Sequence, residues 1–250
     1  MANYISYSLY GNEPKYLHGA IKNAGAVRLF YPGWTSVFYC GDDVPRSIRQ
    51  KLIEQGAKVI DSTDLPAGQG VLWRFQATYL TDAELVIFRD ADSRLSAREA
   101  RLVKQWADSG KDIHIIRDHP NHKEAIMAGM WGARAASLRD KPGVFDPGNL
   151  KIGYGLDQEI LRRTIYRDKG LSRMIHDCIF LREVDSISPP LPASKEGFIG
   201  ESYSENDTPD AGARGQLDLF RASAIFRFKT HAMNFIKALR DFIKDLVKAP

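Results

Sequence analysis

Short apolar segments alternate with longer amphipathic segments through the first 118 residues, and this alternation restricts the fold more than any other feature of the sequence. Strands are predicted at residues 4–11, 35–43, 57–63, 84–92 and 112–118, and helices at residues 13–31, 45–56, 71–80 and 96–110. Successive β-α units build an open, mostly parallel sheet with helices on both faces. We therefore expect an α/β protein whose ligands bind beyond the carboxyl ends of the strands.

Two aspartates stand at the end of the fourth predicted strand. The run from residue 84 to 88 is apolar apart from its first residue, which is typical of a strand buried on both faces, and Asp90 and Asp92 come next. Two carboxylates this close repel each other unless a positive charge lies between them. Carboxylate oxygens suit Mg²⁺ or Mn²⁺ and leave coordination positions free for phosphates. The alternative is a solvated turn in which Asp92 caps the next helix.

Composition limits the classes of protein that the chain can belong to. With 44% apolar residues in a chain of 250, a full core is expected, and the absence of a long apolar run predicts no membrane span. The two cysteines, Cys40 and Cys178, lie far apart, which favours buried thiols in a reducing compartment. The N-terminus has no signal-peptide pattern, so we expect a cytoplasmic protein.

The net charge of +4 is concentrated at the C-terminus. Residues 217–250 contain seven Lys or Arg against three Asp, so the remaining residues are close to neutral. A neutral body argues against nucleic-acid binding. In residues 217–248 apolar side chains recur every three or four positions, which predicts one long amphipathic helix. We therefore divide the chain into a catalytic domain, residues 1–216, and a basic C-terminal helix, residues 217–250.

The aspartate block resembles that of nucleotide-sugar glycosyltransferases of the GT-A fold, which combine a Rossmann-type mixed sheet with an Asp-x-Asp motif after its fourth strand. In "FRDADSR" the resemblance makes Asp90 and Asp92 the carboxylates that hold Mn²⁺ or Mg²⁺. It also implies that Arg74, in "VLWRFQA", contacts the donor. The implied activity is metal-dependent transfer of a sugar from a nucleotide diphosphate to an acceptor.

Two later segments extend the resemblance to about residue 201. "GLDQEIL" matches the Asp-Gln pair at the start of a helix beneath the sugar, which implies catalytic roles for Asp157 and Gln158. "MIHDC" offers His176 as a further metal ligand, because some members of the family use a late histidine. An inverting enzyme needs a base for the acceptor hydroxyl, and Asp157 is the best candidate. A helix N-cap is the structural alternative for Asp157.

Further residues near the strand ends are candidates for substrate contact. Arg94 could stabilise the charge that grows on the leaving phosphate. His119 lies past the fifth strand, at the same sheet edge as Asp90, and is assigned to donor or acceptor contact, with metal ligation and a plain loop position as alternatives. Trp131, between two glycines, could present a flat face to a sugar or be buried in the core.

Partners and rival functions follow from the same features. The acceptor is a glycan, a lipid-linked precursor or a small molecule, and residues 217–250 either pack on the catalytic domain or contact an anionic membrane as a peripheral anchor. One rival is a non-catalytic sugar or nucleotide binder docked at a membrane. The other is an Asp-x-Asp phosphohydrolase, whose aspartates normally lie near the N-terminus, whereas three strands precede Asp90 here.

Overall fold

The computed structural model describes residues 1–62, 68–141, 143–189, 191–192, 196–223, 232 and 234–240. The strands of this described part are β1 (Ala2–Leu9), β2 (Trp34–Cys40), β3 (Lys58–Asp61), β4 (Ala83–Phe88), β5 (Ile113–Arg117), β6 (Trp131–Arg134) and β7 (Arg173–Asp177). Its α-helices are α1 (Pro14–Phe30), α2 (Arg46–Glu54), α3 (Gly70–Trp73), α4 (Ala97–Ser109), α5 (Ala135–Arg139), α6 (Leu156–Leu161) and α7 (Ala211–Ala222). A 3₁₀ helix, η1 (Arg74–Tyr79), continues α3, and a π-helical segment, η2 (Arg162–Tyr166), continues α6.

The strands form one sheet in the order β3-β2-β1-β4-β6-β5-β7. All neighbouring pairs are parallel except those that involve β6, which runs antiparallel between β4 and β5. The expected mixed α/β sheet is therefore confirmed, and the segment around Trp131 is a strand. Because β6 is antiparallel, its beginning lies at the edge where β4 ends, with Trp131 paired to Phe88.

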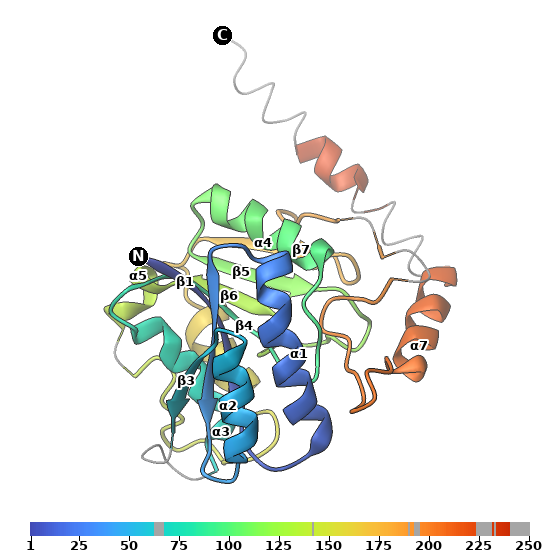
Figure 1. Ribbon diagram of the computed structural model, residues 1–250. Coiled ribbons are helices and arrows are strands. Elements are labelled where there is room, and N and C mark those ends of the chain that lie inside the picture. Colours follow the sequence, from blue (N-terminus) through green and yellow to red (C-terminus); the bar gives the residue numbers. More distant parts are fainter. Residues whose placement is uncertain are drawn as a thin grey trace.

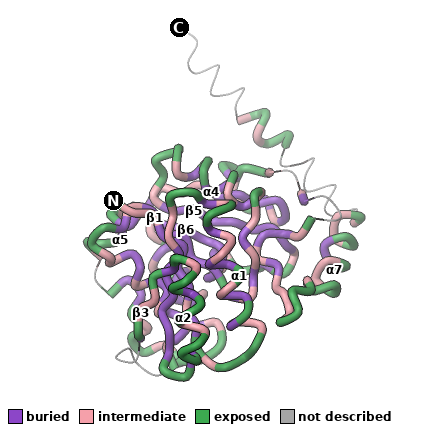
Figure 2. Tube along the Cα trace, viewed as in Figure 1, coloured by how far each residue is buried: buried purple, intermediate pink, exposed green. Residues whose placement is uncertain are grey.

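Alternating side chains of the strands bury two separate apolar layers. Ile5 and Ile87 face α1, α2 and the inner side of α4, where Trp106 is fully buried. Tyr4 and Phe88 face the opposite layer, which α3, η1, α5, α6 and η2 cover. Figure 1 shows α1 and α2 together in front of the sheet, and Figure 2 shows the buried strands at its centre. The period-2 alternation of a strand explains why one sequence supplies both layers.

Local signals in the sequence determine several helix ends. The side chain of Ser96 accepts a hydrogen bond from the backbone N–H of Glu99 at 3.1 Å, so Ser96 is the N-cap of α4, at the start of the helix predicted over residues 96–110. That helix ends at Gly110, whose positive φ of 72° suits glycine. Asp210 caps α7 in the same way as Ser96 caps α4, through the N–H of Ala213 at 3.0 Å.

The predicted C-terminal helix differs from the structure at its start and is interrupted at Ser223. α7 begins at Ala211, six residues before the predicted start at residue 217, and ends at Ala222, because Ser223 has an extended backbone with ψ of 142°. The predicted domain boundary at residue 216 falls inside α7. Residues 224–231, 233 and 241–250 lie outside the described part, and residues 234–240 are helical. Among the described helices, none has the length and apolar character needed to cross a bilayer.

Candidate active site

The turn after β4 brings two carboxylates to the carboxyl edge of the sheet. Arg89 points the other way, into the core, where its guanidinium pairs with the buried carboxylate of Glu99. The next residue, Asp90, has a side chain that is 52% exposed. Its carbonyl oxygen accepts hydrogen bonds from the N–H of Ser93 at 3.2 Å and from the hydroxyl of Ser93 at 2.8 Å. This anchored turn explains why an arginine and two aspartates follow an apolar strand.

Arg74 joins two of the predicted acidic residues. Its Nη1 donates a hydrogen bond to a carboxylate oxygen of Asp90, and its Nη2 donates one to Asp157 Oδ2 at 2.8 Å. The side chain of Arg74 is 6% exposed, and that of Asp157 is 11% exposed, so the contact between these two residues is buried. Burial alone would lower the pKa of Arg74, but Asp90 and Asp157 outweigh it, and the pKa is raised. Arg74 is therefore a fixed positive charge between two carboxylates.

Asp157 and Gln158 enter the same place from the start of α6. The N-cap position belongs to Gly155, in the left-handed region with φ of 82°, so Asp157 is not the cap. Asp157 Oδ1 accepts the N–H of Gln158 at 2.9 Å while Oδ2 accepts from Arg74. Each carboxylate oxygen keeps further acceptor capacity. The cap alternative is thus excluded, and both residues border the space above Arg74.

Asp92 has a cation beside it that the sequence did not predict. The ammonium of Lys15, in the first turn of α1, lies 3.3 Å from Asp92 Oδ2. Burial and repulsion from Asp90 raise the pKa of Asp92, and Lys15 offsets part of this rise. Burial would lower the pKa of Lys15, but its contacts with Tyr16 and Asp92 raise it. The site therefore favours additional positive charge near the two aspartates.

The absence of a side chain at Gly129 leaves room for Asp90. A Cβ atom at this position would lie 2.0 Å from Asp90 Oδ2 and 2.5 Å from its Cγ. Gly129 precedes β6, whose first residues lie next to the end of β4. The "AGMWG" segment thus contributes to the site through a glycine rather than through the predicted tryptophan.

These residues line a cleft of about 440 Å³ at the carboxyl edge of the sheet. Its walls come from the end of β1, the start of α1, the loop before β6 and the start of α6. Its aromatic lining residues are Tyr10, Tyr16 and Tyr154. A second hollow of about 490 Å³, between α1 and α4, lacks such convergent carboxylates. We assign the candidate active site to the acidic cleft, since ligands of open α/β sheets bind at that edge.

The donor set of the cleft fits a hard divalent cation. Asp90 and Asp92 supply carboxylate oxygens, and Mg²⁺ or Mn²⁺ needs only one or two of them when phosphates complete the coordination. Burial and, to a smaller extent, repulsion from Asp90 raise the pKa of Asp92, and a cation between the two carboxylates would relieve this repulsion. In the described part of the chain, no group of three or more His, Cys, Asp or Glu side chains converges on a metal position. A metal at this edge would thus be held by the two aspartates.

His176 does not join the aspartates. It lies in β7, at the far edge of the sheet, and is fully buried. Its Nδ1 is 2.7 Å from His114 Nε2, and its Nε2 is 2.9 Å from Gln105 Oε1. Both ring nitrogens therefore have protein partners beneath α4. The prediction that His176 is a metal ligand is wrong.

Three other predicted contacts lie outside the cleft. His119 is buried, stacks on Phe198 with ring centroids 4.1 Å apart, and contacts the carbonyl of Ala213 in α7. Trp131 is fully buried and stacks on Phe88, so the core alternative is correct. Arg94 points to Asp207 at 2.8 Å and to the carbonyls of Asp92 and Ser93. None of these three side chains is positioned to touch a ligand in the cleft.

Fold and cleft together define an α/β protein with an acidic site at its sheet edge. No protein-family model and no curated protein matches the chain. Solved structures match at a distance. One is glucosyl-3-phosphoglycerate synthase from Mycobacterium tuberculosis in complex with Mn²⁺, UDP and phosphoglyceric acid, with 15% identity, 70% of this chain and 67% of that chain covered, and a TM-score of 0.47.

Two further structures are similar over the same share of the chain. A glycosyltransferase involved in glycosylation of the major capsid of PBCV-1 has 13% identity, 71% of this chain and 82% of that chain covered, and a TM-score of 0.46. S. aureus TarS has 14% identity, 70% and 58% covered, and a TM-score of 0.49. At these identities the similarity concerns the course of the backbone and not the substrate.

Proposed function

We propose that this protein is a metal-dependent glycosyltransferase that moves a sugar from a nucleotide diphosphate to an acceptor. The observation that carries the proposal is the convergence of Asp90, Asp92, Arg74 and Asp157 in one cleft at the carboxyl edge of the sheet. The buried guanidinium of Arg74 joins the turn after β4 to the start of α6 and so holds two of these carboxylates at one side of the cleft. The convergence agrees with the roles that the sequence resemblance assigns to these four residues.

In this proposal Asp90 and Asp92 hold Mn²⁺ or Mg²⁺, which would supply positive charge to the diphosphate as it leaves. Lys15, whose ammonium already lies at Asp92, is close enough to the same carboxylates to add a second positive charge for a phosphate. Arg74 keeps Asp90 and Asp157 in a fixed arrangement, because its guanidinium is buried and both of its contacts are charge-assisted. The charges would thus be arranged before the donor arrives.

The transfer exchanges one bond for another at the anomeric carbon. The bond from this carbon to the phosphate oxygen breaks, its electron pair goes to the diphosphate, and a bond to the acceptor oxygen forms. In an inverting enzyme Asp157 takes the proton of the acceptor hydroxyl, using the acceptor capacity that Arg74 and Gln158 leave free. In a retaining enzyme Asp157 or Gln158 is the polar group beside the reacting carbon.

Thermal unfolding with UDP and GDP, each with and without Mn²⁺, tests the proposal. Wild type is expected to gain stability only when nucleotide and metal are both present, by about 2.7 kcal/mol at a ligand concentration of a hundred times Kd. Asp92→Ala should lose this gain, because the metal would lose one of its two carboxylates. Equal protection of wild type and variant would refute the metal assignment.

Turnover then separates the proposed transferase from its rivals. A panel of nucleotide sugars with Mn²⁺ should release the nucleoside diphosphate from at least one donor. Metal-dependent binding without turnover would indicate a non-catalytic binder. Hydrolysis of simple phosphate esters in the absence of nucleotide would indicate a phosphohydrolase.

We further propose that the C-terminal segment contacts an anionic membrane. Within residues 234–240, Phe235 is 70% exposed and Leu239 is 47% exposed, so apolar side chains face away from the described body. Lys237 and Arg240 hydrogen-bond the carbonyls of Ser186 and Val184, which ties this helical segment to the loop after β7. The basic excess of the C-terminus suits anionic lipid headgroups.

A further inference from the structure

One aromatic ring at the cleft stands apart from its surroundings. Tyr154 lines the cleft, yet its relative exposure is 107%, so neighbouring side chains cover none of it. Among the residues that the structure describes, its ring takes part in no stacking contact, cation-π contact or hydrogen bond. An aromatic ring that is left open at the entrance of a cleft is available to a ligand.

The other two tyrosines of the cleft already have partners. The ring of Tyr10 meets the ring of Trp73 edge to face, with centroids 5.8 Å apart. The ring of Tyr16 lies under the ammonium of Lys15, 4.5 Å from its centroid. Both come from the β1 and α1 side of the cleft, whereas Tyr154 comes from the α6 side. Tyr154 therefore supplies the open aromatic surface of that side.

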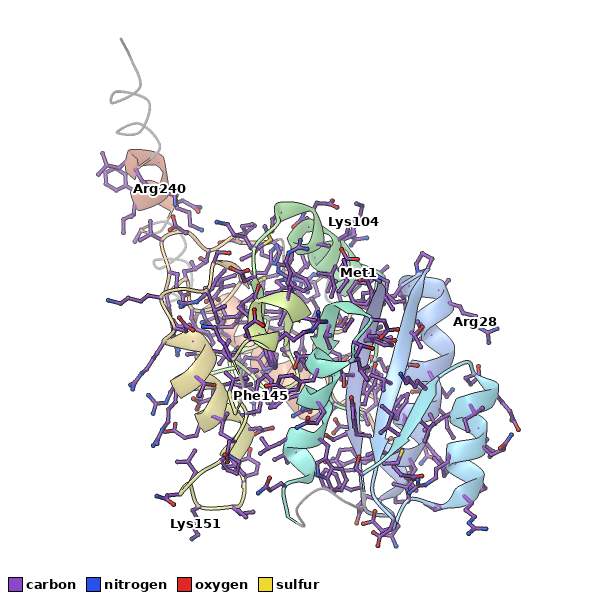
Figure 3. The ribbon with its side chains drawn as sticks, turned by 90° about the vertical axis from the view of Figure 1, so that its left-hand side faces the viewer. Met1, Arg28, Lys104, Phe145, Lys151 and Arg240 are labelled. Atoms are coloured by element: carbon purple, nitrogen blue, oxygen red, sulfur yellow. The ribbon has the colours of Figure 1, made fainter. Side chains whose placement is uncertain are left out.

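The chain couples Tyr154 to the proposed catalytic residues. Tyr154 stands three positions before Asp157, and only Gly155 and Leu156 separate them. Leu156 is buried, which anchors the start of α6 in the core. Gly155 has φ of 82°, a conformation that glycine adopts without strain and that turns the chain from the exposed ring into the helix. In Figure 3 the loop around Lys151 leads into this part of the molecule, at the end opposite to Met1 and Lys104.

We propose that Tyr154 is a stacking platform for the acceptor and that the acceptor is a carbohydrate. This inference rests on the proposed function, because it takes Asp157 as the group nearest the acceptor hydroxyl. A pyranose ring presents an apolar C–H face that buries area against an aromatic ring, and hydroxyls at its edge that a carboxylate can accept from. A flat exposed ring beside a carboxylate matches that chemistry. A small anionic acceptor would instead need basic side chains on this side, and the cleft-lining residues there are Tyr154, Gly155, Asp157 and Gln158.

A glycan array of defined oligosaccharides, probed with the full-length protein, tests the platform. Four proteins are compared, namely wild type, Tyr154→Ala, Tyr154→Phe and Ile152→Ala. Ile152 is the matched control because it is 49% exposed in the same loop but does not line the cleft. Thermal stabilisation by UDP with Mn²⁺ is measured on the same four proteins. Because Tyr154 is fully exposed, its substitution leaves the core untouched.

Wild type is expected to retain a subset of glycans, and Tyr154→Phe and Ile152→Ala should retain the same subset. Tyr154→Ala should bind these glycans at least tenfold more weakly, with its stabilisation by UDP and Mn²⁺ unchanged. The platform is overturned if wild type retains no glycan or if Tyr154→Ala binds as wild type does. It is also overturned if Tyr154→Ala loses the UDP response, since the ring would then serve the nucleotide.

Failure of the broader proposal gives a different result. If neither UDP nor GDP stabilises wild type in the presence of Mn²⁺, the transferase proposal fails. Glycan binding that still depends on Tyr154 would then support the carbohydrate platform in a protein that is not a transferase.

Discussion

A position without a side chain decides where the carboxylate of Asp90 can lie. Gly129→Ala would place a Cβ atom 2.0 Å from Asp90 Oδ2, and the side chain of Asp90 would have to rotate away from Arg74. Because the displaced group is a side chain and not backbone, we expect the fold to persist. The affinity for UDP with Mn²⁺, measured by thermal shift, should fall at least tenfold.

Gly215→Ala provides the control for this substitution. Gly215 lies inside α7, and a Cβ atom there meets nothing within 4 Å. Alanine in a helix interior is favoured over glycine by about 1 kcal/mol, so this variant should be slightly more stable and bind UDP normally. Normal binding by Gly129→Ala would mean that Asp90 does not hold the metal.

Asp157→Asn separates a catalytic carboxylate from a structural one. The amide keeps the size of the side chain but cannot act as a base, so turnover should drop by about 10²–10⁴-fold while donor affinity changes only a few-fold. The value of kcat and the Kd of the donor are measured for the variant and for wild type, and the two changes are compared. Asp82→Asn is the control, since Asp82 accepts a hydrogen bond from Tyr4 and lies outside the cleft. A loss of melting temperature without a specific loss of kcat would show that Asp157 acts only through Arg74.

Buried histidines make the protein sensitive to acid. Burial, with a smaller contribution from His119, lowers the pKa of His122 from 6.5 to about 3. Burial also lowers the pKa of His176 to about 4 and that of His114 well below its usual range. In the unfolded chain these rings bind protons near pH 6.5, so their contribution to stability is complete above that pH. It is lost as the pH falls from about 6.5 toward 3.

His122→Asn should therefore flatten the acid side of the stability profile. The asparagine oxygen can replace His122 Nδ1 as the acceptor for the N–H of Asp118, and it does not titrate. The free energy of unfolding, measured by urea denaturation from pH 7 to pH 4, should fall less steeply than in wild type. His18→Asn, at an exposed position of α1, should leave the profile unchanged. Identical profiles for His122→Asn and wild type would contradict this account.

Residue types and a strand end predicted the pair Asp90 and Asp92, and the family resemblance implied Arg74, Asp157 and Gln158. Neither showed which side chains are free to act. Arg74, Asp90, Asp92, Asp157 and Gln158 converge because each follows or begins an element at the same sheet edge. His119 and His176 have ring nitrogens that could bind a ligand, but these nitrogens contact other groups of the protein. The sequence alone does not reveal such hydrogen-bond partners. Gly129 and Lys15 were missed because their contributions depend on distances across the sheet.

At the scale of elements, the turn after β4 is supported by a distant segment. The N–H of Tyr203 donates to the carbonyl of Asp92 at 2.9 Å, and Ser93 forms a β-bridge with Ser202. Arg94 joins the same two stretches through Asp207 and the carbonyl of Asp92. Arg94, which was predicted to stabilise the charge on the leaving phosphate, thus positions the loop that carries Asp92.

Arg94→Ala should make the loop that carries Asp92 less rigid but leave the residues that line the cleft in place. The variant loses a charge-assisted contact to Asp207 and two carbonyl contacts, so UDP with Mn²⁺ should bind about three- to tenfold more weakly. Titration by thermal shift checks this, with Arg101→Ala as the control on the outer face of α4, where the side chain is exposed. If Arg94→Ala binds UDP and Mn²⁺ as wild type does, segment 202–209 does not support the metal loop.

Elements with a strong period were predictable, and short or irregular ones were not. β1, β2, β4 and β5 lie within a few residues of their predicted ranges, because each contains several apolar or aromatic residues that the sheet buries. β6 has four residues and could not be distinguished from a buried loop, and β7 was not predicted at all. The stretch predicted as one helix from residue 71 is instead α3 followed by the 3₁₀ helix η1, which directs Arg74 into the cleft.

At the scale of the whole molecule, α7 belongs to the body that carries the cleft. Leu217 is 3% exposed and packs with Phe198 and Ile179. Arg214 pairs with the buried carboxylate of Glu201, and the carbonyl of Ala213 contacts His119. Removing residues from 217 onward would therefore expose apolar core. A truncation that keeps all of α7, and with it this apolar core, can therefore be made after Ser223.

Truncation after Ser223 is thus the test of membrane contact. Residues 224–250 contain six Lys or Arg and two Asp, and each basic residue near an anionic surface contributes about 1 kcal/mol. The full chain should sediment at low salt with vesicles that contain phosphatidylserine, and less with vesicles of phosphatidylcholine alone. Residues 1–223 should stay in the supernatant, and their melting temperature should equal that of the full chain. Phe235→Ser with Leu239→Ser keeps all charges and should weaken binding, because the exposed apolar area is lost. Equal sedimentation of the full chain and residues 1–223 would exclude this anchor, and a lower melting temperature of residues 1–223 would mean that the segment packs on the body.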